Sequence, residues 1–282
     1  MLTILIDGIA YGMLLFVLAS GLAVTLGLMN FVNLAHGAFA LMGGYATALL
    51  MNRAGLPFLA TLPFAFLIPA LIGAAAERTL YARLYNRGHL DQVLFSIGLV
   101  FMTMAAADWL FGSQQQLITL PGWLQGRFEL FGVPVGRYRA FLIVVCALLV
   151  IGLQLILART RFGARLRAAV DNQRVARGLG INVGGIFATT FAVGSGLAGL
   201  GGALGVEILG MDPSFPLKFM VYVLIVVTIG GTTSLTGPFL AALIIGVADV
   251  AGKYYLPEFG AFLIYLLMIV ILILRPQGLI AR

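Results

Sequence analysis

The chain has 282 residues, of which 61% are apolar and only 10% are charged, whereas about a quarter of the residues in an average soluble domain carry a charge. Ten acidic and seventeen basic side chains are too few to cover a soluble surface of this size, so hydrocarbon must face most of the exterior. This composition excludes a soluble two-domain enzyme. No polar linker divides the chain, and we expect one transmembrane domain over residues 1–282.

Charge-poor stretches indicate the number of spans, because a helix needs about 20 residues to cross the hydrocarbon and rarely carries ions there. About eight hydrophobic elements follow in chain order: two within residues 8–52, one each within 54–76, 92–112, 140–158 and 178–206, a seventh of doubtful form at 219–248, and a last at 259–274. Alternating ten-residue segments typical of barrel strands occur nowhere in the sequence. The sequence predicts an all-α integral membrane protein, a polytopic bundle with one or two broken or re-entrant segments.

Arginine-rich loops predict the orientation of the bundle. Residues 159–177 hold six arginines and one aspartate, and residues 77–91 hold three arginines, so both loops should face the cytoplasm. Three spans precede the first of these loops, which places the N-terminus outside. Residues 113–139 should then also lie outside, although they carry three arginines of their own.

The orientation of the C-terminal end determines whether the seventh element crosses the membrane an even or an odd number of times. Arg275 and Arg282 favour the cytoplasm, the sixth span leaves it, and the last span must return to it. The seventh element therefore crosses an even number of times, as two short helices or as a re-entrant hairpin. We expect the break at residues 230–238, Gly-Gly-Thr-Thr-Ser-Leu-Thr-Gly-Pro, because glycine and proline interrupt helices.

Glycine is abundant within the predicted spans. Gly8 and Gly12 share one helix face, as do Gly201 and Gly205, and we interpret both pairs as tight packing between helices rather than as a dimer contact. The six glycines between residues 194 and 205 indicate a helix that is packed on more than one side.

Two polar interruptions of apolar runs stand 200 residues apart. Residues 36–39 read His-Gly-Ala-Phe and residues 236–239 read Thr-Gly-Pro-Phe. Transporters are often built from repeats whose interrupted helices line the substrate path. We therefore hypothesise a pathway role for Asn33, His36, Thr233 and Ser234. The alternative for the asparagine and the histidine is ordinary hydrogen bonding between helices.

Enzymatic and ion-coupling chemistry find little support in the sequence. The one Gly-Lys pair, at residues 252–253, is followed by Tyr254, and Val247 stands where a P-loop needs its first glycine, so we do not expect this chain to hydrolyse ATP. The intramembrane acids lie at or near span ends, where a carboxylate can reach the headgroups: Asp108, Glu207 and Asp249.

Residues 161–181 predict a short amphipathic helix on the cytoplasmic side. Arg161 and Arg165 point away from its apolar face, which consists of Phe162, Leu166, Ala169 and Val170. A basic helix lying on anionic lipid and a helix held in the groove of a cytoplasmic partner fit this composition equally well.

Three motifs, in order and separated by spans, resemble permease subunits of branched-chain amino acid ABC importers. The first is residues 30–37, Asn-Phe-Val-Asn-Leu-Ala-His-Gly, followed by Gly-Gly-Tyr at 43–45, and the third is residues 230–238. The second comprises Arg161-Phe162-Gly163, Arg167-Ala168, Asn172, Ala176 and Gly180-Ile181-Asn182. The resemblance covers essentially the whole chain, and the short N-terminus is more similar to the H-type than to the M-type subunit.

This resemblance implies one half of a translocation pathway in the bacterial inner membrane. It implies a second permease subunit, two cytoplasmic ATPases that bind ATP and magnesium, and a periplasmic solute-binding protein, with no cofactor or metal on this chain. The coupling segment, about residues 159–182, would contact the ATPases through Arg161, Phe162, Gly163, Arg167, Asn172, Ala176 and Gly180. The residues near the pathway would include Asn33, His36, Gly37, Thr236 and Gly237.

Departures from the family pattern leave the solute open. Arg177 stands where a neutral residue is expected, and Thr233 stands where relatives commonly show Asn. The resemblance therefore implies branched-chain or other small amino acids. An ion-coupled secondary carrier and a passive channel for urea or short amides are the alternatives, and neither of them would need an ATPase.

Overall fold

The computed structural model describes residues 1–29, 31, 33–85, 87–130, 132–231, 234–275 and 278–279. Thr233 and Arg282, which carry predictions above, lie outside these residues, as do Asn30, Val32 and Thr232 of the motifs. The fold is helical, as predicted, with elements α1 (Leu2–Met29), α2 (His36–Asn52), α3 (Phe58–Thr79), η1 (Tyr81–Arg83), α4 (His89–Phe111), α5 (Arg137–Arg159), α6 (Arg161–Asp171), α7 (Gln173–Gly178), α8 (Val183–Leu209), α9 (Phe215–Gly230), α10 (Thr236–Tyr255) and α11 (Gly260–Leu274).

Six of the helices in the described part of the chain are long and apolar enough to cross a membrane, namely α1, α3, α4, α5, α8 and α10. Each predicted hydrophobic stretch contains helix, and the doubtful seventh stretch forms two helices, α9 and α10. Helix α9 ends at Gly230, and the next residue, Gly231, has a φ of 81°, which L side chains rarely adopt. Two helices are one of the two forms that the parity argument allows, and the number of crossings here stays a prediction.

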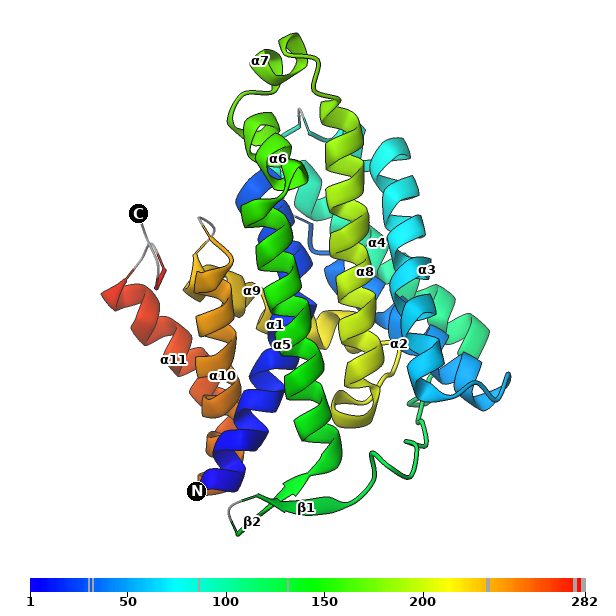
Figure 1. The fold of residues 1–282 in the computed structure, drawn as a ribbon, viewed down its shortest axis with the longest axis vertical. Coiled ribbons are helices and arrows are strands. Elements are labelled where there is room, and N and C mark those ends of the chain that lie inside the picture. The colour runs from blue at the N-terminus through cyan, green and yellow to red at the C-terminus, as the bar shows by residue number, and fades with distance from the viewer. Residues whose placement is uncertain are drawn as a thin grey trace.

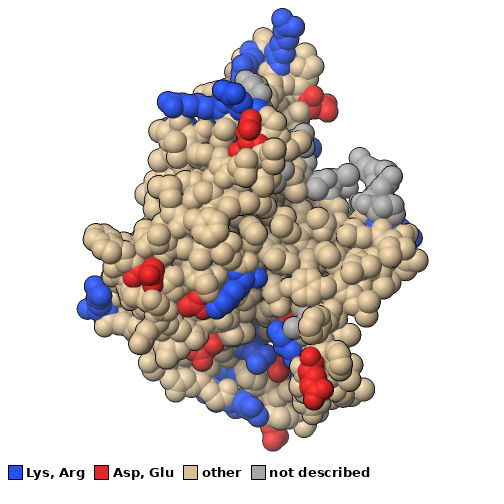
Figure 2. All heavy atoms as spheres, turned by 180° about the vertical axis from the view of Figure 1, so that it is seen from behind, with Lys and Arg blue, Asp and Glu red and all other residues tan. Residues whose placement is uncertain are grey.

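The two ends of the bundle differ in structure and charge. Figure 1 shows the N-terminus and the hairpin of β1 (Arg127–Leu130) and β2 (Val133–Gly136) at one end, with α6 and α7 at the other. Arginines gather at the α6 and α7 end, and a largely uncharged zone separates it from a half that carries both signs (Figure 2). The predicted cytoplasmic loop and the predicted outer segment therefore lie at opposite ends of the molecule.

One of the three arginines in the segment that is predicted to lie outside forms an ion pair. The Arg139 Nε atom at the start of α5 lies 3.1 Å from the Asp7 Oδ1 atom in the first turns of α1. This ion pair joins two helices at the outer end and offsets part of the positive charge there.

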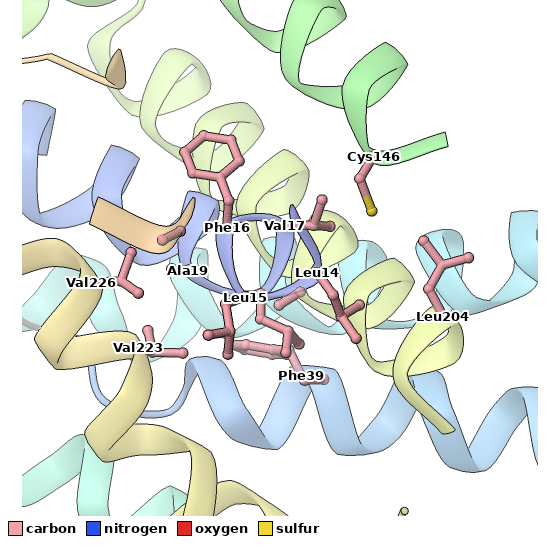
Figure 3. Packing of buried hydrophobic residues seen from close by; sticks show 14 of the residues in the cluster. Leu14, Leu15, Phe16, Val17, Ala19, Phe39, Cys146, Leu204, Val223 and Val226 are labelled. Carbon is pink, nitrogen blue, oxygen red and sulfur yellow. The ribbon is translucent and has the colours of Figure 1, made fainter. Parts of the chain in front are cut away.

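Helix α1 lies at the centre of the packing. The consecutive side chains Leu14, Leu15, Phe16 and Val17 point to different sides of the helix, and all four are buried. Figure 3 shows them among residues of α2, α5, α8 and α9. A helix that is apolar all round is expected to be buried. It also contacts α10 along much of its length.

Glycines permit the closest helix contacts, and these lie within the subunit. A Cβ atom at Gly12 would be 2.6 Å from the Ala242 carbonyl oxygen of α10, and one at Gly8 would be 2.6 Å from the Val247 Cα atom. On α8, Gly201 faces Leu18 of α1 and Gly202 faces the backbone of α2, so this helix is packed on more than one side, as predicted.

Candidate functional site

Helix α6 has the apolar face that the sequence predicts, but this face packs onto the bundle rather than onto lipid or into the groove of a partner, the two places considered from the sequence. The Thr160 hydroxyl accepts a hydrogen bond from the Gly163 N–H at 3.3 Å and caps the first turn of the helix. Leu166 and Ala169 are fully buried. They form one cluster with Val183 and Phe187 of α8, and the predicted face residues Phe162 and Val170 pack against this cluster.

Two predicted coupling residues fasten α6 to the end of α5. A Cβ atom at Gly163 would collide with the Leu157 carbonyl oxygen, so only glycine allows this approach of the two helices. The Arg167 guanidinium donates a hydrogen bond from Nη1 to the same Leu157 carbonyl at 2.5 Å. Gly163 and Arg167 therefore shape the coupling segment.

Two asparagines and a glycine set the path from α6 to α8. The Asn172 Oδ1 atom accepts a hydrogen bond from the Val175 N–H at 3.0 Å and caps α7. The Asn182 Oδ1 atom caps α8 by accepting from the Gly185 N–H at 2.9 Å. Between them Gly180 has a φ of 78°, which only glycine adopts without strain.

The tip of the coupling segment exposes apolar side chains that sequence reasoning missed. Leu179 is 75% exposed and Val175 is 57% exposed, whereas the predicted contact residue Ala176 is buried. Helix α7 projects beyond α6 at the end of the molecule (Figure 1). The sequence does contain a signal for these exposed residues, because they are apolar and stand among arginines outside the spans. Arg161 and Asn172 are exposed as well, and their contact with an ATPase stays a prediction.

The cluster beneath α6 reaches the membrane helices. Met29 at the end of α1 and Tyr85, just after η1, pack against it. The Tyr85 hydroxyl donates a hydrogen bond to the Glu77 Oε1 atom of α3 at 2.8 Å, and its ring lies 5.5 Å from that of Phe187. Burial and the Glu77 carboxylate raise the pKa of Tyr85 far above its usual range, so the hydroxyl stays protonated. A movement of α6 would reach α1 and α8 directly, and α3 through Tyr85.

The first predicted pathway motif lies in the interior of the subunit. The Asn33 Oδ1 atom accepts hydrogen bonds from the Tyr81 hydroxyl and the Ala35 N–H, both at 3.1 Å. His36 is buried, and its Nε2 atom fits beside Gly21, where a Cβ atom would collide with it. The contacts of Asn33 agree with the alternative of hydrogen bonding between elements of the chain. The pathway role of Asn33 and His36 stays a prediction.

The second motif begins a helix in the same way as the first. His36 is the first residue of α2 and Thr236 is the first residue of α10, each after a break. The next residues, Gly37 and Gly237, allow close contact with α9, at Pro216 near its start and at Gly230 at its end. At 1.5 Å per residue these contacts are about 20 Å apart, so the structure does not bring the two motifs together.

Of the two other predicted pathway residues near α10, the structure describes only one. The Ser234 Oγ atom lies 3.0 Å from the Thr236 Oγ1 atom. Thr233 lies outside the described residues. The pathway role of this motif therefore also stays a prediction.

Comparison with known proteins identifies the family. The protein family described as branched-chain amino acid transport system / permease component matches residues 4–272. The permease protein BraD of a high-affinity branched-chain amino acid transport system in Pseudomonas aeruginosa is 26% identical over 99% of this chain and 95% of its own length. The corresponding LivH protein of Escherichia coli is 25% identical, over 98% and 94%.

The extent of the matches separates the two subunit types. A LivM permease protein of Salmonella typhimurium is 28% identical over 95% of this chain, but the match covers only 68% of LivM. The similarity to LivH proteins over nearly their full length agrees with the predicted H-type subunit. No solved structure matches the chain. The match over almost the entire sequence, on a bundle of apolar helices, shows that the chain belongs to the family of permease components of branched-chain amino acid transport systems.

Proposed function

We propose that this chain forms one half of the translocation pathway of an ATP-driven importer of branched-chain or other small amino acids. It works in the inner membrane with a second permease subunit, two cytoplasmic ATPase subunits and an extracytoplasmic solute-binding protein. ATP and magnesium bind to the ATPase subunits, because the sequence around the Gly-Lys pair at residues 252–253 lacks the pattern of a P-loop. Membership in the permease family and the named transport systems of BraD and LivH support this proposal.

The observation that supports the coupling role is that α6 is anchored to the bundle whereas the segment at α7 is exposed. Helix α6 is anchored by buried Leu166 and Ala169, whereas α7 projects, and Val175 within it and Leu179 just after it are exposed. An interfacial helix on lipid would bury its apolar face in the headgroups, but the apolar face of α6 is already occupied by α8. A groove on a cytoplasmic partner therefore fits the exposed tip better.

The mechanism follows from this anchoring. When ATP binding draws the two ATPases together, the tip held by one of them moves, and α6 passes the displacement to α5 and α8. The helices then change between two packed arrangements, which open the pathway to one side of the membrane at a time. No covalent bond in the solute changes.

The test is retention of the ATPase subunit by the purified permease. Leu179→Asp places a charge at the apolar tip, and we expect at least a tenfold loss of ATPase binding, which corresponds to about 1.4 kcal/mol. Leu117→Asp is the matched control, because Leu117 is 69% exposed in the segment that precedes the β1–β2 hairpin, and its complex should keep the ATPase. Equal retention by both variants would refute the coupling role.

The alternatives predict transport without an ATPase. Uptake by this chain alone in liposomes, driven by a sodium or proton gradient, would support a secondary carrier. Uptake of urea without an energy source would support a channel. Either result would refute the proposed function, which predicts uptake only in the assembled complex with ATP.

A further inference from the structure

A cavity of about 780 Å³ lies at the end of the bundle opposite α6 and α7. Residues from α1, α5, α8, α9, α10 and the β1–β2 hairpin line it. We call it the outer vestibule, and the residues that matter for its chemistry are Asp7, Arg139, Phe219, Asp249, Val250 and Lys253. By the charge rule this end faces away from the cytoplasm, on the side from which an importer receives its solute.

The vestibule contains a buried carboxylate with a free oxygen. Asp249 is only 2% exposed, although its place near the end of a span led us to expect that it reaches the headgroups. Its Oδ2 atom accepts a hydrogen bond from the Lys253 ammonium at 2.7 Å. Its Oδ1 atom has no hydrogen-bond partner among the residues that the structure describes. Such a buried acceptor is costly to leave unpaired, and a cationic N–H donor would satisfy it.

Charges of both signs and apolar walls surround this oxygen. Lys253 has its ammonium half in solvent, beside the Asp249 carboxylate, and the Asp7–Arg139 ion pair lies on the same cavity. Phe219 and Val250 supply ring and aliphatic surface to its wall. A ligand that fits needs an ammonium group, a carboxylate close to it, and an apolar body.

We propose that the outer vestibule binds the zwitterion of an apolar α-amino acid. The ligand ammonium donates to Asp249 Oδ1, its carboxylate accepts from the Lys253 ammonium, and its side chain lies against Phe219 and Val250. Adjacent carboxylate and ammonium groups on the protein match adjacent groups of opposite sign on an α-amino acid. This inference rests on the proposed function and assigns a solute site to it.

Protection of an engineered cysteine tests the site. The single native cysteine is removed with Cys146→Ala, and Thr3→Cys places a thiol on the vestibule wall. In the assembled complex, leucine should slow the reaction of this thiol with a membrane-impermeant methanethiosulfonate. The same concentration of 4-methylpentanoate, which has the leucine skeleton without the ammonium, should protect at least tenfold less.

Variants of the charged pair distinguish recognition from general structure. Asp249→Asn should raise the leucine concentration needed for half protection at least tenfold and remove the preference over 4-methylpentanoate. Lys253→Gln, which changes a more exposed side chain, should also raise that leucine concentration. Glu258→Gln changes an exposed acid in the loop after α10 and should leave protection unchanged.

The experiments distinguish failure of the vestibule proposal from failure of the proposed function. If the wild-type complex imports neither branched-chain nor other small amino acids, the proposed function is wrong, and the vestibule proposal is wrong with it. If that complex imports leucine but leucine does not protect the thiol, the vestibule proposal alone is wrong. The same conclusion follows if Asp249→Asn leaves both the protection and the preference intact.

Discussion

The crossing of α1 and α10 offers a sharp test of the packing, through a single added methyl group. In Gly12→Ala, the new Cβ atom would lie 2.6 Å from the Ala242 carbonyl oxygen and 2.9 Å from the Leu243 Cα atom. Both neighbours are backbone atoms of a helix, so rotation of a side chain cannot relieve the contact. The two helices must separate instead.

The size of the effect follows from these distances. Ordinary carbon to oxygen contacts begin at about 3.3 Å, so α1 and α10 must move apart by about 0.7 Å. Overpacking of this kind costs about 1–3 kcal/mol, and the contact of backbone with backbone places Gly12→Ala toward the upper half of that range. Replacing a helical glycine by alanine also gains about 0.5–1 kcal/mol of helix propensity, which must be removed from the comparison.

The control variant Gly152→Ala has the same gain in helix propensity without the overpacking, because Gly152 lies inside α5 and a Cβ atom there meets no atom within 4 Å. Equilibrium unfolding in mixed detergent micelles, followed by circular dichroism, gives the free energy of unfolding of both variants. We expect Gly152→Ala to be as stable as the wild type or slightly more stable, and Gly12→Ala to be about 2–3 kcal/mol less stable than Gly152→Ala. Equal stability of the two variants would refute the packing of α1 on α10.

Three further predictions follow from local contacts. Leu166→Ala should lower the free energy of unfolding by about 2–5 kcal/mol, since Leu166 is fully buried on the inner face of α6, and the ATPase activity of the assembled complex should respond less to solute. Asn172→Ala removes the cap of α7 and should weaken ATPase retention without changing the helix content of the bundle, measured by circular dichroism. Burial by itself raises the pKa of Asp212, but hydrogen bonds from Lys218 and Ser214 outweigh it and hold the pKa below 3.8. The stabilisation by this carboxylate is therefore present above pH 3.8 and lost as the pH falls through the folded pKa, so Asp212→Asn should flatten the acid limb of the stability profile, and an unchanged limb would contradict this.

Features that depend on local sequence could be predicted well. Hydropathy and charge identify the spans because each helix must meet the hydrocarbon by itself, and the apolar face of α6 follows from its spacing. The break between α9 and α10 follows from Gly230 and Gly231, since glycine permits the backbone conformation that ends α9.

Features that depend on several elements could not be predicted. The short β1–β2 hairpin has no clear signal in its loop. Sequence alone could not place the Asn33 amide against Tyr81, because the two residues are 48 positions apart in the chain and meet only in the folded bundle. Asp249 near a span end suggested contact with headgroups, but the surrounding helices bury it. The outer vestibule combines residues from five helices and a hairpin, which no single periodicity reveals.

The central claim is that the exposed tip after α7 faces the cytoplasm and carries the ATPase contact. Leu179→Cys in the Cys146→Ala background tests it with one measurement, labelling by a membrane-impermeant maleimide. The thiol should stay unlabelled in intact cells, react in inside-out vesicles that have been stripped of the ATPase subunits, and be protected when those subunits are added back. Labelling in intact cells, or no protection by the ATPase subunits, would contradict the claim.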